Sequence, residues 1–93
     1  MRKIEKQMIA ALQEGRNFEL DNTRVEGNSV YLHNHHIADM VDGKCIVNMD
    51  TLVAWPTRTT RSRLNALGAH VNVVKGITFV NGSMILSSFF KEQ

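Results

Sequence analysis

Three turn-forming dipeptides, spaced seven and eight residues apart, constrain the fold of this chain more than any other feature of its sequence. They are Gly27-Asn28, Asn34-His35 and Asp42-Gly43. Gly, Asn and Asp tolerate the positive φ that two-residue hairpin turns require. The segments between the turns are short and contain many β-branched residues, as strands do. The spacing therefore predicts a four-stranded antiparallel meander over residues 22–48.

The three turns also predict a register. They pair Val25 with Val30, Leu32 with Ile37, and Asp39 with Ile46. One face of the sheet should then be mostly apolar, with Asp39 as its one polar misfit, and should collect Val25, Val30, Leu32, Ile37 and Ile46. The other face should carry Tyr31, Ala38, Met40, Cys45 and Val47. This agreement between separate turns supports the meander, because a slip of one residue would reverse every side chain.

Patterns typical of helices occur both before and after the predicted meander. Ile4, Met8, Ala11 and Leu12 form an apolar stripe at helical spacing, which predicts an amphipathic helix over residues 2–14, ended by Gly15. A second, shorter helix is predicted over residues 57–67. Thr57 or Thr59 can cap its N-terminus, Gly68 can close it, and Leu64 and Leu67 form its inward side.

The last predicted element is a β-hairpin over residues 71–88. Asn81-Gly82 is the strongest hairpin dipeptide in the chain, and it sets Phe79 opposite Met84 and Ile77 opposite Leu86. Gly76 is interpreted as a bulge in the first strand. Helices combined with antiparallel strands predict a two-layer α+β fold, with residues 1–93 forming a single domain.

The charge and cysteine content of the chain limit which partners, cross-links and cellular locations are expected. The formal net charge is only +2, so any nucleic-acid surface must come from local clustering of cations. Cys45 is the only cysteine, which rules out an internal disulfide and a cysteine-based zinc site. The N-terminal segment lacks the continuous apolar core of a signal peptide, and no apolar run is long enough to span a membrane. A cytoplasmic location is expected.

Three blocks of sequence carry a resemblance to a known family. "NTRVE", "VYLHNHHIA" and "WPTRTTRSRLNAL" cover about half of the chain between residues 22 and 67. They resemble a family of small, uncharacterised proteins of tailed bacteriophages with the patterns NTxV, LHGNxIA and GWxTxTTxxRLNAL. This sequence departs from them at Asn34-His35, where Gly-Asn is usual, and at Ala54, where Gly is usual. The resemblance implies a phage accessory protein that works in the bacterial cytoplasm, and it implies no particular chemistry.

The segment "RTTRSRLNA" holds the candidate partner-binding residues. At 100° per residue, the side of the helix opposite Leu64 and Leu67 carries four polar side chains: Arg58, Arg61, Ser62 and Asn65. Arg63, the fifth candidate, lies on the flank of this side. Arginine forks bind phosphates and also anchor protein interfaces. Three interpretations stand: a protein-binding surface, a nucleic-acid contact that includes Lys and Arg of the first helix, or a solvated helix face.

The histidines and the aromatic residues each allow two interpretations. If Asn34-His35 is the turn, His33 and His36 flank it side by side and can hold a metal when Asp39 or His70 joins them. The alternative, a polar turn in water, is favoured, so no cofactor is expected. Trp55 is expected in the core, with exposure to a partner as the alternative. Phe89 and Phe90 are candidates for a homodimer contact.

Two functions follow from these observations. No catalytic motif is present, so the chain is not expected to be an enzyme. The first expectation is a phage accessory protein that binds and modulates or inhibits a host protein, such as a defence or transcription component. The second is a nucleic-acid-binding accessory protein that uses the arginine-rich helix.

Overall fold

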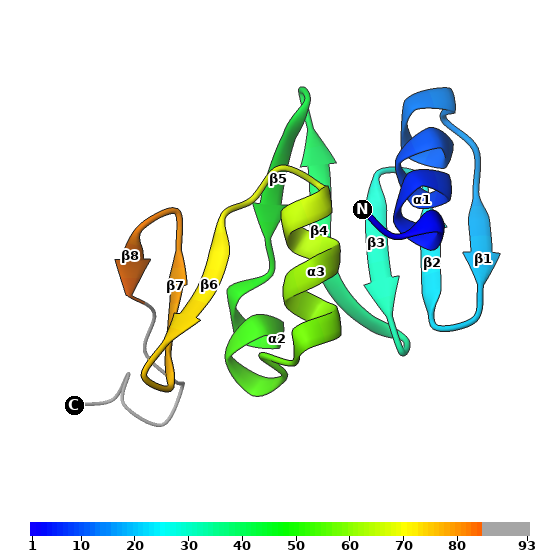
Figure 1. The fold of residues 1–93 in the computed structure, drawn as a ribbon. Helices are drawn as coiled ribbons and strands as arrows, with labels where there is room; N and C mark the ends of the chain where they lie inside the picture. Colours follow the sequence, from blue (N-terminus) through cyan, green and yellow to red (C-terminus); the bar gives the residue numbers. More distant parts are fainter. Residues whose placement is uncertain (85–93) are drawn as a thin grey trace.

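The computed structural model describes residues 1–84. The pairing of Ile77 with Leu86, the end of the predicted hairpin and the contact expected from Phe89 and Phe90 lie outside the described residues. Figure 1 shows the order of the elements, whose bounds are α1 Lys3–Glu14, β1 Phe18–Leu20, β2 Thr23–Glu26, β3 Ser29–Leu32, β4 His35–Val41, β5 Lys44–Val47, α2 Met49–Ala54, α3 Arg58–Ala66, β6 Val71–Val74, β7 Ile77–Val80 and β8 Ser83–Met84.

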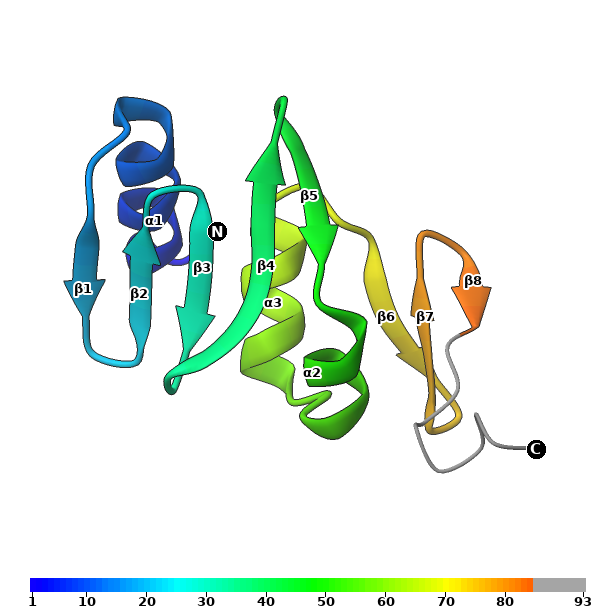
Figure 2. The same ribbon diagram turned by 180° about the vertical axis from the view of Figure 1, so that it is seen from behind.

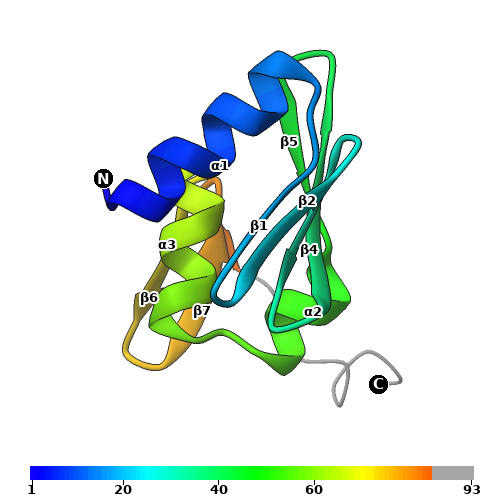
Figure 3. The same ribbon diagram turned by 90° about the vertical axis from the view of Figure 1, so that its right-hand side faces the viewer.

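The architecture is the predicted α+β fold. Strands β1 to β5 form one antiparallel sheet in sequence order, and β6, β7 and β8 form a second, smaller antiparallel sheet. Helices α1 and α3 cover one face of the larger sheet, and α2 lies at one end of it (Figure 3). Seen from behind, the other face carries none of the helices of residues 1–84 (Figure 2). No helix within residues 1–84 has the length and apolar character needed to cross a membrane.

The larger sheet has one strand more than the sequence predicted. Strand β1 pairs with β2 through a tight turn at Asp21, which has a φ of 52°, and Phe18 lies opposite Val25. A strand of three residues is too short to display an alternating pattern, so its sequence does not distinguish it from a loop. Its addition makes the meander five-stranded.

A β-bulge in β4 corrects the predicted register. The turn falls at His33-Asn34, with φ of 51° and 65°, one residue earlier than predicted, so Leu32 pairs with His35 and not with Ile37. Val30 then lies opposite Ala38, which leaves Ile37 as the extra residue of a bulge. Ile37 and Ala38 are both buried.

The bulge reverses the alternation beyond it. Ala38 turns toward the helices, and the neighbouring residues that pack against the core with it are Met40, Cys45 and Val47. The predicted face was therefore wrong for these four residues and for Ile46, which is 53% exposed. Asp39 does pair with Ile46 as predicted, but both lie on the uncovered face. The apparent misfit of Asp39 disappears for this reason.

The core joins both sheets through the helices. Met8 of α1 and Leu64 of α3 are fully buried against Val25 and Val30 of the larger sheet. The smaller sheet adds Val71 and other residues to the same cluster, so α3 contacts both sheets. The expected pairing of Phe79 with Met84 is confirmed. Gly76, however, is part of a tight turn between β6 and β7 and not a bulge.

Two helix ends follow the sequence signals, and one helix was missed. Gly15 has a φ of 69° and ends α1 in the left-handed conformation, as predicted. Helix α2 was not predicted, although Asn48 provides its N-cap by accepting a hydrogen bond from the Thr51 N–H at 3.3 Å. With Leu52 as its one buried residue, α2 has no apolar stripe that periodicity could detect.

Candidate functional site

Helix α3 is fixed at both ends, so its outward side chains have defined positions. Thr57 is the N-cap, and its Oγ1 accepts a hydrogen bond from the Thr60 N–H at 3.1 Å. Gly68, with a φ of 104°, follows the helix, and the Ala69 N–H donates to the Leu64 carbonyl at 3.1 Å. The predicted cap and the predicted end are both confirmed.

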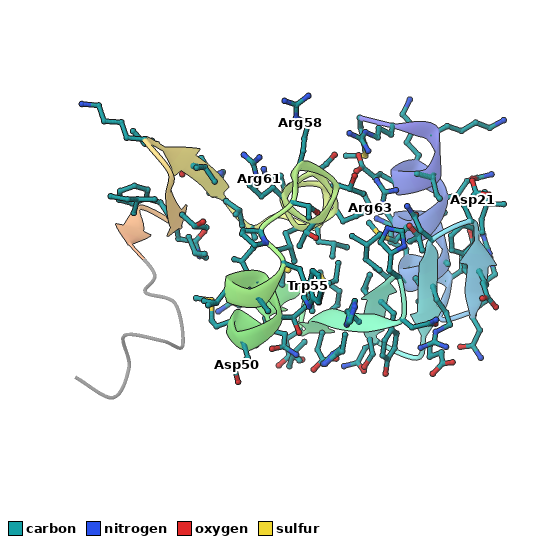
Figure 4. The ribbon with its side chains drawn as sticks, turned by 90° about the horizontal axis from the view of Figure 1, so that it is seen from below. Asp21, Asp50, Trp55, Arg58, Arg61 and Arg63 are labelled. Carbon is teal, nitrogen blue, oxygen red and sulfur yellow. The ribbon has the colours of Figure 1, made fainter. Side chains whose placement is uncertain are left out.

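Arg58 and Arg61 occupy the surface positions expected of them. In Figure 4, Arg58 points away from the helix layer, Arg61 lies on the side of α3 that faces β6, and Arg63 points toward α1. Arg58 is exposed and Arg61 is half-buried. Within residues 1–84, neither Arg58 nor Arg61 forms an ion pair.

Arg63 is a core residue, contrary to its assignment as a surface contact. It is 3% exposed, and its Nη1 donates to Glu5 Oε2 at 2.7 Å. Its Nε donates to Thr23 Oγ1 at 3.0 Å, and its Nη2 donates to Asn22 Oδ1 at 3.4 Å. Helix periodicity placed it on the flank of the polar face. That flank is covered by α1 in the folded chain, and helix periodicity does not reveal such a neighbour.

Ser62 and Asn65 are also engaged inside the protein. The Ser62 hydroxyl donates to Glu5 Oε2 at 2.6 Å. The Asn65 side chain bridges to β6, where its Nδ2 donates to the Val71 carbonyl at 2.9 Å and its Oδ1 accepts from the Val71 N–H at 2.7 Å. Of the five candidate contacts, only Arg58 and Arg61 have side chains that are uncommitted within residues 1–84.

Glu5 connects α1 to α3. Its burial alone would raise the pKa of the carboxyl group. Hydrogen bonds from Ser62, from Arg63 and from the Arg2 backbone N–H outweigh that effect and lower the pKa of Glu5 below its ordinary value. The carboxylate is therefore ionised near neutral pH, and Arg63 neutralises its charge.

A surface groove runs between α1, α3 and β6. We call it the arginine groove; Arg2 and Glu5 of the α1 end, Arg58 and Arg61 of α3, and Asn72 of β6 all line it. Its volume is about 570 Å³. The groove brings Arg58 and Arg61, which were predicted from the sequence as partner-binding residues, together with Arg2. Arg2 belongs to the predicted first helix, whose Lys and Arg residues were part of the nucleic-acid hypothesis.

Trp55 lies at the surface and not in the core, where it was expected. It is 51% exposed, and its ring stacks on His35 with 5.1 Å between centroids and 26° between planes. The two rings border a small cavity of about 160 Å³, the Trp55 pocket, whose apolar lining includes Leu32 and Ile37. Leu52, three residues earlier in α2, is instead the buried apolar residue of this segment, at 1% exposed.

The predicted histidine pair is not formed. His33 is a turn residue with a φ of 51°, while His36 lies within β4 opposite Tyr31. They do not flank a turn, because the turn is shifted by one residue. No group of three or more His, Cys, Asp or Glu side chains in the described part of the chain is arranged to hold a metal ion.

His36 belongs instead to a polar network on the uncovered face of the sheet. Its Nε2 lies 2.8 Å from Asp39 Oδ1, and its Nδ1 lies 3.4 Å from Asn48 Nδ2. The Ser29 hydroxyl donates to the same Asp39 oxygen at 2.6 Å, and these contacts lower the pKa of Asp39. Ser29 and His36 both bond Asp39 and not each other, so they lack the serine–histidine contact of a nucleophilic triad.

Glu5 and His35 are the site residues that sequence reasoning missed. Glu5 lies one position after Ile4 in the first helix, where a charged residue ordinarily faces water. The available signal was a glutamate in the first helical turn, where its carboxylate can accept a hydrogen bond from the N-cap backbone N–H, as Glu5 does from Arg2. His35 was assigned to a turn, and only the shifted register brings it beside Trp55.

Comparison with known proteins supports the phage origin implied by the sequence blocks. The family model described as "Kyanoviridae Gp96 protein" matches residues 1–93. No curated protein and no solved structure matches the chain. Because the family match extends over the whole sequence, the chain belongs to the Kyanoviridae Gp96 family of bacteriophage proteins.

Proposed function

We propose that this phage protein is a non-catalytic accessory protein that binds a host protein in the bacterial cytoplasm and modulates or inhibits it. A defence or transcription component is the class of partner expected. The observation that carries the proposal is the exposed Trp55, stacked on His35 beside the Trp55 pocket.

Tryptophan contributes to binding through its large, rigid and mostly apolar surface. It is enriched among the residues that dominate the energy of protein interfaces, where it fits beside a pocket on the partner or on its own surface. In this chain His35 holds the Trp55 ring in place before binding, which reduces the entropy lost when a partner docks. Arg58 and Arg61 supply further side chains of a type that is common in interfaces.

A capture experiment with matched variants tests the proposal. The tagged protein, Trp55→Ala and Ile46→Ala are each incubated with nuclease-treated lysate of a host bacterium. Ile46 is the control because it is similarly exposed, at 53%, but lies on the uncovered face of the sheet. The unchanged protein and Ile46→Ala should recover the same host protein.

Trp55→Ala should weaken that binding by at least about 30-fold, which corresponds to the roughly 2 kcal/mol expected of a residue that dominates an interface. Its affinity is measured with the purified partner. Equal recovery by Trp55→Ala and the unchanged protein would contradict the proposal, as would the recovery of no specific host protein.

Nucleic-acid binding is the second candidate function. The specific observation that favours it is the convergence of Arg2, Arg58 and Arg61 on one groove. Passage of the purified protein over mixed DNA and RNA columns at low salt tests it, because phosphate contacts are strongest there. A protein that is not retained on either column would rule this candidate out.

A further inference from the structure

The arginine groove concentrates cations that have no carboxylate partner. Elsewhere in the described part of the chain, arginines are paired: Arg16 with Glu14, Arg24 with Glu26, and Arg63 with Glu5. Within residues 1–84, no ion pair involves Arg2, Arg58 or Arg61. The groove therefore has a local positive charge that the modest net charge of +2 does not reveal.

The one carboxylate in the groove does not cancel this charge. Glu5 Oε2 accepts hydrogen bonds from Ser62 and Arg63, and its Oε1 accepts from the Arg2 backbone N–H at 3.2 Å. Arg63 compensates the charge of the Glu5 carboxylate, so Arg2, Arg58 and Arg61 are not needed to neutralise it. The buried pair thus leaves the positive charge above it available to a ligand.

Two further features favour an anion. The Nε of Arg61 is buried and has no hydrogen-bond partner within residues 1–84. A buried N–H group is costly without an acceptor, so the described residues leave the Arg61 guanidinium incompletely satisfied. The N-terminal end of α1 also contributes to the groove, and a helix N-terminus carries a partial positive charge.

We infer that the arginine groove binds phosphate groups of a nucleic-acid backbone. Arg58 and Arg61 stand three residues apart on α3, which makes them neighbours on the helix surface. Together with Arg2 they present three guanidinium groups from two helix regions, and a chain of phosphates can engage all three at once. This inference rests on the second candidate function and specifies the ligand group and the residues.

A repeating phosphate backbone fits this groove better than an acidic protein segment does. The apolar residues of the wall, such as Ala66 and Val73, offer surface to sugars between the phosphates. The tryptophan expected of a protein-binding surface lies at the separate Trp55 pocket. The three arginine contacts are all to phosphate groups and not to bases, so binding should be independent of nucleotide sequence.

Fluorescence anisotropy with a labelled duplex of mixed sequence tests the inference. Release of counterions by three phosphate contacts predicts a slope of about −2.7 for log affinity against log salt. Raising the salt from about 50 to about 200 mM should then weaken binding by about 40-fold. The double variant Arg58→Ala, Arg61→Ala should flatten the slope to about −0.9, and therefore lose only about 3- to 4-fold over the same range.

The matched control removes the same charge elsewhere. Lys44→Ala, Lys75→Ala changes two exposed lysines outside the groove, and it should keep a slope near that of the unchanged protein. The side chains of Arg58 and Arg61 make no hydrogen bonds or ion pairs within residues 1–84, so their truncation should preserve the fold, which circular dichroism checks.

The possible outcomes distinguish failure of the proposed site from failure of the proposed function. Duplex binding with an unchanged slope in the double arginine variant overturns the groove as the site but leaves nucleic-acid binding in place. The absence of binding to both duplex and single-stranded oligonucleotide overturns both. Equal competition by a polyglutamate peptide and by unlabelled DNA overturns the assignment of phosphate as the ligand and points to an acidic protein segment.

Discussion

Arg63 shows how much the role of a residue depends on what covers it. In sequence it is one of three arginines within six residues, and it has the same chemistry as its neighbours. In the structure it is 3% exposed and donates hydrogen bonds to Glu5, Thr23 and Asn22. It therefore ties α3 to α1 and to the sheet, while Arg58 and Arg61 remain at the surface.

Removing Arg63 should destabilise the protein strongly. Arg63→Ala leaves the Glu5 carboxylate buried without a compensating charge, at an expected loss of about 3–5 kcal/mol. For a domain of this size, that corresponds to a fall in melting temperature of about 12 °C or more. Thermal unfolding followed by circular dichroism measures it. Arg58→Ala, the exposed control, should change the stability by less than about 0.5 kcal/mol, and equal effects would contradict the assignment.

The lowered pKa of Glu5 predicts how the stability of the protein depends on pH. Its pKa in the folded state is below the ordinary value of 4.5. Its contribution is therefore complete above pH 4.5 and is lost as the pH falls through the lowered pKa. Glu5→Gln should be less stable than the unchanged protein at neutral pH, and the difference in stability should shrink as the pH falls below 4.5 and through the lowered pKa of Glu5. Urea titrations across this range test it, and a gap that stays constant would show that ionisation of Glu5 contributes nothing.

At the scale of elements, the β-bulge in β4 decides which residues form the core. The predicted turns at Gly27-Asn28 and Asp42-Gly43 have the expected registers. Between them, the turn at His33-Asn34 and the extra residue Ile37 shift β4. The shift buries Ala38 and turns Asp39 outward, so it corrects a pattern that looked inconsistent in the sequence.

Suitable substitutions in the turn at His33-Asn34 should stabilise the fold. Both residues have positive φ, which suits the Asn-Gly pair of a type I′ turn better than His-Asn. The double variant His33→Asn, Asn34→Gly should raise the free energy of unfolding by about 0.5–1 kcal/mol, since backbone strain is relieved. Asn34→Val should instead lower it by about 1–2 kcal/mol. Chemical denaturation measures both, and the same sign for both variants would contradict the turn geometry.

At the scale of the whole molecule, α3 is the element that joins the two sheets. Its buried Leu64 belongs to the common core, and Asn65 clamps β6 through both hydrogen bonds of Val71. The arginine groove lies along this junction, because α3 and β6 form two of its sides. The packing of the smaller sheet against α3 therefore shapes the candidate binding surface.

Asn65→Ala should loosen the smaller sheet selectively. The variant loses two hydrogen bonds to the backbone of Val71, at an expected cost of about 1–3 kcal/mol. Amide hydrogen exchange should accelerate in β6 and β7, while β2 to β4 keep their protection. Asn72→Ala, in the same strand but without such a clamp, should leave exchange unchanged. Uniform acceleration across both sheets would show that the clamp acts on global stability instead.

The sequence by itself determined the α+β class, the first and third helices with their ends, and most of the hairpin turns. These features depend on local signals: the 3.6-residue stripe of α1, the Thr57 cap and the positive φ of Gly, Asn and Asp. The sequence blocks also pointed to a phage family, which the match to residues 1–93 confirms at the level of the family.

Only the tertiary structure decided which polar and aromatic side chains reach the surface. Arg63 is buried because α1 covers its flank, and His33 and His36 separate because the turn shifts by one residue. Trp55 lies at the surface, stacked on His35 of β4, while Leu52 of the same segment is buried. Each outcome depends on a neighbour that is distant in sequence or on a register. Local periodicity carries no information about which distant element packs against a given face, so it nominated Arg58, Arg61 and Arg63 and could not show that α1 buries Arg63.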